Sequence, residues 1–358
     1  MSQRIAVISH ACVVETNQSP YIELSSHFEV SLIVPSRWRD TLRPDGYTAS
    51  RSPAFAGRFV RVRTVGLGHP QRHVALVRAR ALLQRERVSF VVIEEEPFSL
   101  AAAKWSRAAT RLALPFAVQV AENLPRHLPA PVSRECRRVL EQCAFVLARS
   151  PAALERAREW GYRGPATVVA HGVDNVSDGA VAHPLDVVGF VGRLVTEKGV
   201  DDLAAALDEH STLRLRVAGD GPRREAFARL GDRVEMLGTL ASSQMPAFYD
   251  SISVLAVPSR TTPTWSEQFG RVIVEAEARA TPVVAYDSGE IPWVARETGA
   301  ELVREGDVAA LGACLERVAK DPDLARKRGE SAREAVRRQF TNRAGADALA
   351  RFIARALG

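Results

Sequence analysis

Short apolar runs alternate along the whole chain with longer segments of mixed polarity. Several of the runs, such as FVVI at 90–93 and PVVAY at 282–286, are continuously apolar instead of alternating with polar residues. Strands buried on both faces have this pattern, and they occur in parallel sheets that helices cover. The pattern therefore predicts an α/β fold.

The expected strands form two series. The first series covers residues 4–9, 29–34, 59–65, 90–93, 115–120, 145–148 and 167–169. The second covers 187–191, 213–218, 234–237, 253–257, 282–285 and 301–303. Helices are expected between them, over 74–87, 134–142, 152–159, 199–209, 308–320 and 331–339, with a further helix running from near Gly270 to Ala280.

Two successive βα series in 358 residues predict two Rossmann-like domains. The polar, small-residue stretch 174–184 ends in Pro before a new strand, so it is the expected boundary. The predicted division is a first domain over 1–175, a second over 184–335, and a C-terminal helix over 336–358 that packs back on the first domain. Two such domains facing each other enclose a cleft, which is where ligands usually bind.

The composition excludes several classes of protein. The apolar fraction of 46% and the charged fraction of 25% are ordinary for a globular chain. The first apolar run, 5–8, is too short for a signal-peptide core, and no run reaches the roughly 18–20 residues of a membrane helix. The four cysteines, Cys12, Cys136, Cys143 and Cys314, have no CxxC spacing. We therefore expect a cytoplasmic protein without a disulfide framework or a zinc site.

The charge is uneven between the two halves. Residues 1–180 carry 24 Lys and Arg against 16 Asp and Glu, a charge of +8, whereas residues 181–358 carry 24 against 26, a charge of −2. A basic first half suits an anionic partner, such as a phosphorylated acceptor, the inner face of a membrane or nucleic acid. The alternative is that the positive charge serves only solubility and reflects Arg-rich codon usage, since the chain has 44 Arg and only 4 Lys. Aromatic residues are 6% and scattered, so a stacking platform for single-stranded nucleic acid is not expected.

Two cations follow the first strand of the second series. The segment GFVGRLVTEKG places Gly192, Arg193 and Lys198 after that strand and before a helix. Cations at the carboxyl end of a parallel strand suit a phosphate or a diphosphate. A solvated turn with a surface Arg and Lys is the alternative. Gly219 and Asp220 follow the next strand, where a glycine permits close approach of a ligand, although an ordinary strand-to-helix turn has the same composition.

A pair of carboxylates flanks the start of another expected helix. In EQFGRVIVE, Glu267 precedes Gly270, and Glu275 lies about one and a half turns into the helix. Backbone N–H groups at a helix start bind anions, and carboxylates accept hydrogen bonds from sugar hydroxyls. The alternative interpretations are that Glu267 is a routine partner of the helix dipole and that Glu275 is a solvated helix residue.

These segments, together with TPVVA and SGEIPWVA, resemble the donor-binding domain of GT-B retaining glycosyltransferases of family GT4 over about residues 187–320. The resemblance implies that Arg193 and Lys198 bind the donor diphosphate, that Glu267 holds the transferred sugar and that Glu275 holds the ribose. It also implies a donor-binding role for Gly192, Gly219, Asp220, Phe269, Gly270, Arg271 and Val272. The first domain would bind the acceptor.

The acceptor side of the resemblance is weaker. The chain has Ser9-His10-Ala11-Cys12 where many members carry a Gly-Gly loop. His10, Glu95, Glu122 and Asn123 end expected strands and are candidate acceptor contacts. The only Asp-x-Asp, 321–323, contains a proline that suits a helix start, so we expect no metal and no cofactor.

The sequence thus predicts a retaining glycosyltransferase that uses a nucleotide-diphosphate sugar, expected to be a UDP-sugar, without a metal. By the resemblance, attack occurs on the front face, and the departing phosphate oxygen takes the acceptor's proton. Two alternatives stay open. The same donor site could serve water or phosphate as the nucleophile, or the basic half could belong to a noncatalytic anion-binding or nucleic-acid-binding protein.

Overall fold

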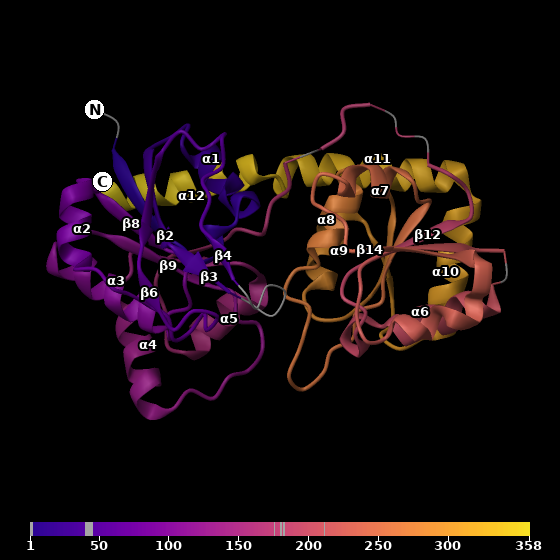
Figure 1. Ribbon diagram of the computed structural model, residues 1–358, viewed down its shortest axis with the longest axis horizontal. Helices are drawn as coiled ribbons and strands as arrows, with labels where there is room; N and C mark the ends of the chain where they lie inside the picture. Colours follow the sequence, from indigo (N-terminus) through magenta and orange to yellow (C-terminus); the bar gives the residue numbers. More distant parts are fainter. Residues whose placement is uncertain (1–2, 40–45, 175, 180, 182, 211) are drawn as a thin grey trace. The chain divides into compact units, whose positions relative to one another are not determined.

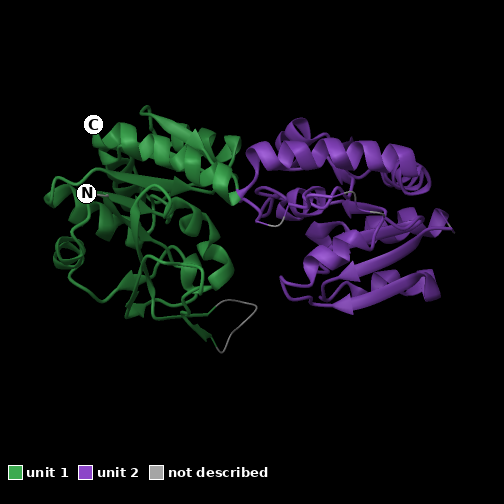
Figure 2. Ribbon diagram, turned by 90° about the horizontal axis from the view of Figure 1, so that it is seen from above, with its two compact units in different colours: residues 1–170, 342–358 green, residues 171–341 purple. Residues whose placement is uncertain are grey.

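The computed structural model describes residues 3–39, 46–174, 176–179, 181, 183–210 and 212–358 (Figure 1). The chain forms two compact units (Figure 2). Unit 1 contains residues 1–170 and 342–358, and unit 2 contains residues 171–341. The sequence places the divisions at 175, which lies outside the described residues, and at 336.

Unit 1 contains a seven-stranded parallel sheet in the order β11-β10-β9-β8-β1-β2-β5. Its strands are β1 (Arg4–Ile8), β2 (Glu29–Pro35), β5 (Arg58–Val62), β8 (Phe90–Ile93), β9 (Phe116–Val120), β10 (Phe145–Ala148) and β11 (Ala166–Val168). Successive residues of β1 face opposite sides of the sheet: Ile5 and Val7 join one buried core, and Ala6 and Ile8 join the other. Both faces are apolar because helices cover both.

The helices of unit 1 divide between these two faces. One face is covered by α2 (Ala79–Glu86), α3 (Leu100–Arg111), α4 (Ala130–Gln142) and α5 (Pro151–Glu159). The other is covered by α1 (Ser19–Leu24) and α12 (Asn342–Leu357), which pack against each other. The C-terminal helix therefore belongs to unit 1, although more than 170 residues of unit 2 precede it.

One expected helix of unit 1 is wrong at its start. The range 74–87 begins with a strand, β7 (Val74–Ala75), which pairs antiparallel with β6 (Thr64–Val65). The helix begins only at Ala79, after Arg78. A second two-stranded ribbon, β3 (Arg37–Trp38) with β4 (Tyr47–Thr48), was also not predicted.

Unit 2 contains a six-stranded parallel sheet in the order β14-β13-β12-β15-β16-β17. The strands are β12 (Val187–Val191), β13 (Arg214–Ala218), β14 (Val234–Gly238), β15 (Val254–Val257), β16 (Val283–Tyr286) and β17 (Glu301–Val303). The expected strands of both series are confirmed within a few residues, except that 59–65 divides into β5 and β6.

The helices of unit 2 are α6 (Val200–Glu209), α7 (Met245–Asp250), α8 (Arg271–Glu277), α9 (Ile291–Thr298), α10 (Val308–Lys320) and α11 (Pro322–Gln339). The expected helix 270–280 is too long, because α8 ends at Glu277 and Ala280 has a left-handed φ of +58°. The Asp321 side chain accepts a hydrogen bond from the Leu324 amide at 2.9 Å, with Pro322 in the first turn. This confirms that the Asp-x-Asp begins a helix.

Each sheet reverses its strand order at one place. In unit 1 the chain runs outward from β1 to β2 and β5, then crosses to β8 on the other side of β1. In unit 2 it runs from β12 to β13 and β14, then crosses to β15 on the other side of β12. The loops after the two central strands diverge at such a switch point and leave room for a ligand at the carboxyl ends of the strands. Each unit is thus expected to bind a ligand there.

Among the described residues, no helix is both long and apolar enough to cross a membrane.

Candidate functional site

The switch point of unit 2 is built from glycines that pack backbone against backbone. Gly192 follows β12 and Gly219 follows β13, with φ of +150° and +155°. A Cβ on Gly219 would lie 1.9 Å from the carbonyl oxygen of Gly192, so only glycine fits. Asp220 caps the same turn, since its carboxylate accepts from the Gly221 amide at 2.8 Å. The two predicted glycines therefore hold the loops of β12 and β13 together.

Lys198 and Glu267 meet across the switch point. Lys198 ends the 3₁₀ turn Thr196–Lys198 after β12, and Glu267 lies in the loop after β15. The Nζ of Lys198 donates to Oε2 of Glu267 at 2.5 Å, and the side chains are 21% and 13% exposed. Ser259 donates to the same carboxylate oxygen at 3.2 Å. The Lys198 ammonium also lies 4.9 Å from the centre of the Trp265 ring. Sequence reasoning missed Ser259 and Trp265, because no spacing marks them.

Arg193 lies on the same loop as Lys198 and is exposed. Within the described ranges its guanidinium makes no ion pair or hydrogen bond, whereas most arginines of unit 2 pair with a carboxylate. Arg260 next to the site, for example, pairs with Asp202 at 2.7 Å. Arg193 is thus a cation at the carboxyl edge of the sheet with its hydrogen-bonding capacity unused.

The predicted helix start also lies at this edge. Gly270 has a φ of +74° and begins α8, so that Arg271 and the half-buried Val272 form its first turn. Glu275 accepts from the Tyr249 hydroxyl at 2.8 Å and pairs with Arg271 at 2.8 Å. The Phe269 ring is buried, with its centre 5.8 Å from that of Phe340. The Phe269 side chain therefore anchors the loop by packing.

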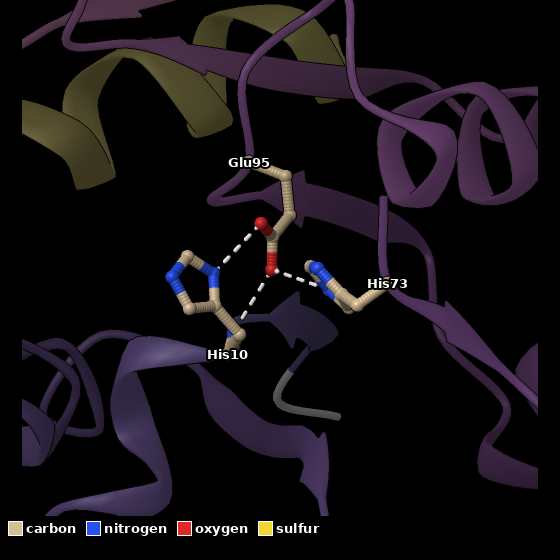
Figure 3. A group of neighbouring side chains, drawn as sticks. All are labelled: His10, His73 and Glu95. Atoms are coloured by element: carbon tan, nitrogen blue, oxygen red, sulfur yellow. Dashed lines mark hydrogen bonds and ion pairs between the residues drawn. The ribbon is translucent and has the colours of Figure 1, made fainter. Parts of the chain in front are cut away.

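The switch point of unit 1 contains two of the predicted acceptor residues. His10 follows β1 and Glu95 follows β8. Glu95 accepts from the backbone N–H of His10 at 2.9 Å, and its other oxygen lies 2.8 Å from the ring Nδ1 of His10 (Figure 3). The Glu95 side chain is 1% exposed, and the His10 side chain is 22% exposed. The structure therefore brings His10 and Glu95 into direct contact.

Sequence reasoning missed His73, which completes this group. Its Nε2 lies 3.3 Å from Oε1 of Glu95, and its Nδ1 lies 2.9 Å from the carbonyl oxygen of Pro70. The Trp38 ring packs on both histidines, with centres 4.8 Å from His10 and 5.1 Å from His73. Trp38 lies in β3 and His73 directly precedes β7, so both belong to the region of the two ribbons that the apolar pattern did not predict. His10, His73 and Glu95 offer donor atoms within 4.8 Å of one another, a set that a metal ion could use.

Glu94 and Glu96, which flank Glu95 in the sequence, contact other residues. Glu94 pairs with Arg149 at 2.5 Å. Glu96 accepts from the backbone N–H of Glu122 at 3.0 Å, and burial raises the pKa of Glu96 to about 8. The Glu122 side chain pairs with Arg126 at 3.0 Å. Glu122 and Asn123 therefore lie on the loop that Glu96 holds.

Charge coupling shifts the protonation of the His10 group. Burial lowers the pKa of His10, but the ion pair and hydrogen bond with Glu95 and the charge of Glu94 raise it, and it ends above its ordinary 6.5. Burial raises the pKa of Glu95, but the charges and hydrogen bonds of His10 and His73 lower it below 4.5. The buried carboxylate is therefore ionised, and the imidazole beside it is a stronger base than usual.

Comparison with known proteins gives the same fold and a match to one family over part of the chain. Residues 177–335 match the family described as Glycosyl transferases group 1. A 2-deoxystreptamine glucosyltransferase of Streptomyces kanamyceticus is 36% identical over 147 residues, which are 38% of this chain and 37% of that relative. The matched part of the chain thus spans little more than a third of the length of this curated relative.

Solved structures resemble the whole chain. The sucrose-phosphate synthase of Thermosynechococcus elongatus has a TM-score of 0.70 at 20% identity and covers 99% of this chain and 98% of its own. HepE of Anabaena, in complex with UDP and glucose, has a TM-score of 0.72 at 17% identity and covers 99% of this chain and 100% of its own. At these identities the similarity shows the fold alone, which is the GT-B fold of two Rossmann-like domains. Within that fold, residues 177–335, nearly all of unit 2, match the family described as Glycosyl transferases group 1.

Proposed function

We propose that the protein is a glycosyltransferase that moves a sugar from a nucleotide-diphosphate sugar to a hydroxyl-bearing acceptor. The observation that carries the proposal is the Lys198–Glu267 pair at the switch point of unit 2, inside the segment that matches the family. A cation and a carboxylate held 2.5 Å apart at that edge fit the two parts of the donor. The cation suits the diphosphate, and the carboxylate suits the sugar hydroxyls.

Binding of the donor gives Lys198 and Glu267 new hydrogen-bond partners. The diphosphate brings oxygens that compete with Glu267 for the Lys198 ammonium, and the released carboxylate accepts from the sugar. Arg193, which has no ion-pair partner in the described chain, supplies the second cation. The amides of Gly270 and Arg271 add donors at the phosphate, and Glu275 holds the ribose, as the resemblance implies.

The chemical step is the departure of the diphosphate. The bond between the anomeric carbon and the phosphate oxygen breaks, and both electrons leave with the phosphate. Fixed positive charge at that oxygen stabilises the transition state more than the ground state. We propose that Lys198 and Arg193 supply this charge without a metal, and that the configuration at the anomeric carbon is retained. UDP is the proposed nucleotide, and the complex of HepE with UDP and glucose supports this choice.

The acceptor and the location remain proposals from the sequence. The excess of positive charge in residues 1–180 supports an anionic acceptor or a contact with the inner face of a membrane. The names of similar proteins, among them the 2-deoxystreptamine glucosyltransferase, make aminocyclitols and cyclitol phosphates rational acceptors for a first panel.

The first experiment is a thermal-shift panel of UDP-, GDP-, ADP- and dTDP-sugars. One nucleotide class is expected to raise the melting temperature of the wild type, because a ligand that binds only the folded state stabilises it. Turnover of that donor is then measured in Lys198→Ala and Glu267→Ala. Each variant should lose about 10²–10³ in kcat, the typical effect of removing one preorganised group.

Lys320→Ala is the matched control. Lys320 pairs with Glu316 at 2.5 Å, the same separation as in the site, but on the exposed surface of α10. Its removal should leave turnover unchanged. Stabilisation by none of the four nucleotide classes, or less than a tenfold loss in both site variants, would contradict the proposal.

A further inference from the structure

Two imidazoles of unit 1 converge on one buried carboxylate. His10 follows β1, Glu95 follows β8 and His73 directly precedes β7, so three separate segments of the chain meet here. The Nδ1 of His10 lies 2.8 Å from Oε2 of Glu95, and the Nε2 of His73 lies 3.3 Å from Oε1 (Figure 3). All three residues belong to unit 1, so the geometry of the group is independent of unit 2.

The hydrogen bond of His73 fixes the position of its lone pair. Its Nδ1 lies 2.9 Å from the carbonyl oxygen of Pro70, which can only accept, so Nδ1 carries the proton. The Nε2 of a neutral His73 then directs its lone pair toward the Glu95 carboxylate, which is also an acceptor. Two acceptors 3.3 Å apart need a cation between them, either a second proton on His73 or a metal ion. Histidines that bind metals commonly donate their other ring N–H to a backbone carbonyl in this way.

The donor atoms are spaced closely enough for one ion. Zinc bonds of about 2.0–2.2 Å at tetrahedral angles place two ligand atoms about 3.3–3.6 Å apart. The donor atoms of His10, His73 and Glu95 all lie within 4.8 Å of one another. A movement of the partly exposed His10 ring on the order of 1 Å therefore brings the set to the spacing of a zinc site.

The surroundings of the group favour an ion held by protein ligands. The Glu95 side chain is 1% exposed, and the Trp38 ring packs on both imidazoles, with centres 4.8 Å from His10 and 5.1 Å from His73. The backbone N–H of His10 donates to Oε1 of Glu95 at 2.9 Å, which orients the carboxylate as outer-shell contacts do in metal sites. The His10 side chain is 22% exposed, so a water from this side can complete four ligands.

We propose that His10, His73 and Glu95 bind one divalent transition-metal ion, with zinc as the expected metal. Zinc accepts two imidazoles and one carboxylate in four-coordinate sites, whereas Mg²⁺ and Ca²⁺ prefer oxygen ligands. The ion joins the loops after β1 and β8 to the segment before β7, so its role is to hold these parts of unit 1 together. It has no part in the proposed glycosyl transfer. The set contains no cysteine, so the cysteine spacing could not indicate it.

The first measurement is a calorimetric titration of the chelator-treated full chain with Zn²⁺. One ion should bind per chain with a dissociation constant below about 1 μM. Mg²⁺ at about a thousandfold higher concentration should not compete, because imidazole nitrogen is a poor ligand for it. At about a hundredfold excess over the dissociation constant, Zn²⁺ should raise the melting temperature by roughly 5–10 °C, since it binds only the folded site.

Two variants locate the ion. His73→Asn removes one imidazole and Glu95→Gln removes the negative charge, so each should weaken Zn²⁺ binding at least about a hundredfold. His210→Asn is the matched control. The Nδ1 of His210 lies 2.8 Å from Oε2 of Glu316, the same separation as in the His10 group, but this carboxylate is 33% exposed. Its removal should leave the affinity for Zn²⁺ unchanged.

X-ray absorption at the zinc edge needs no variant and therefore does not depend on how the variants fold. The wild type with one equivalent of Zn²⁺ should show nitrogen and oxygen ligands at about 2.0–2.2 Å and the outer-shell scattering of two imidazoles. A spectrum without imidazole, the absence of one-to-one binding, or full affinity in both His73→Asn and Glu95→Gln would overturn the proposal. These measurements use no nucleotide sugar, so their results are independent of the thermal-shift panel.

Discussion

The buried carboxyl group of Glu277 should lower the free energy of unfolding at neutral pH by a large amount that can be measured. It lies on α8 with 0% exposure, where its two carboxylate oxygens have no hydrogen-bond partner among the described residues. Burial raises its pKa from 4.5 to about 8. The hydroxyl of Thr298 lies close enough to oppose this shift, but it donates to the Val294 carbonyl at 3.2 Å. Glu277 is therefore protonated in the folded protein at neutral pH.

The sign of the pH dependence follows from the two states. Below pH 4.5 the carboxyl is protonated in both the folded and the unfolded chain, so its ionisation costs nothing. Between pH 4.5 and about 8 only the unfolded chain ionises, and the free energy of unfolding falls by about 1.4 kcal/mol per pH unit. At pH 8 the penalty approaches about 5 kcal/mol, an order-of-magnitude figure for one buried carboxyl.

Glu277→Gln tests this magnitude. The glutamine is neutral at every pH, so the variant should match the wild type at pH 4.5 and become progressively more stable up to pH 8. At about 2–4 °C per kcal/mol for a unit of this size, the melting temperature at pH 8 should rise by roughly 10 °C or more. Glu277→Met should add a further gain that does not depend on pH, because it also removes the buried polar group.

Differential scanning calorimetry of both variants between pH 4.5 and 9 is the measurement. Glu225→Gln, at an exposed glutamate of unit 2, is the control and should follow the wild type at every pH. A difference between Glu277→Gln and the wild type that is the same at pH 4.5 and pH 8 would refute the reasoning.

Two further predictions concern the site of unit 2. Gly199→Ala should lower the melting temperature by several degrees, because the new Cβ would lie 1.8 Å from a backbone carbonyl oxygen at a φ of +66°. Gly231→Ala, at a φ of +54° with nothing within 4 Å, should cost only the backbone strain of about 1 kcal/mol, and equal losses in the two variants would contradict the steric argument. Tyr249→Phe should raise KM for the nucleotide sugar by up to about tenfold with little change in kcat, because it removes a hydrogen bond that holds Glu275, and unchanged kinetics would exclude this role.

The sheets were predictable from the sequence because their signal is local. A strand buried on both faces, such as Phe90–Ile93, must be apolar throughout, and the run is visible without knowledge of its neighbours. The place of the proposed donor-binding residues in the fold was predictable for a similar reason. Gly192, Lys198 and Glu267 belong to short motifs that directly follow such strands, so the end of each strand fixes their place at one edge of the sheet.

The His10 group could be predicted only in part. His10 and Glu95 follow strands, so the strand ends indicated both, but nothing in the sequence indicated that one holds the other. Trp38 lies in the two-residue strand β3 and His73 directly precedes the two-residue strand β7, and such strands are too short to give a periodic pattern. The expected helix 74–87 even placed His73 at a helix start, whereas Val74 pairs with Val65 in an antiparallel ribbon. Contacts of this kind depend on tertiary packing, so no fixed spacing in the sequence indicates them.

The two units have the same arrangement of an ion pair between two loops, but with different residues. In each, an ion pair joins the loop after the first central strand to the loop after the strand across the switch point: Lys198 with Glu267 in unit 2, and His10 with Glu95 in unit 1. The ammonium group of Lys198 suits a leaving group whose negative charge must be stabilised. Burial lowers the pKa of His10 but Glu95 raises it above its ordinary value, so the charge of this second pair depends on pH.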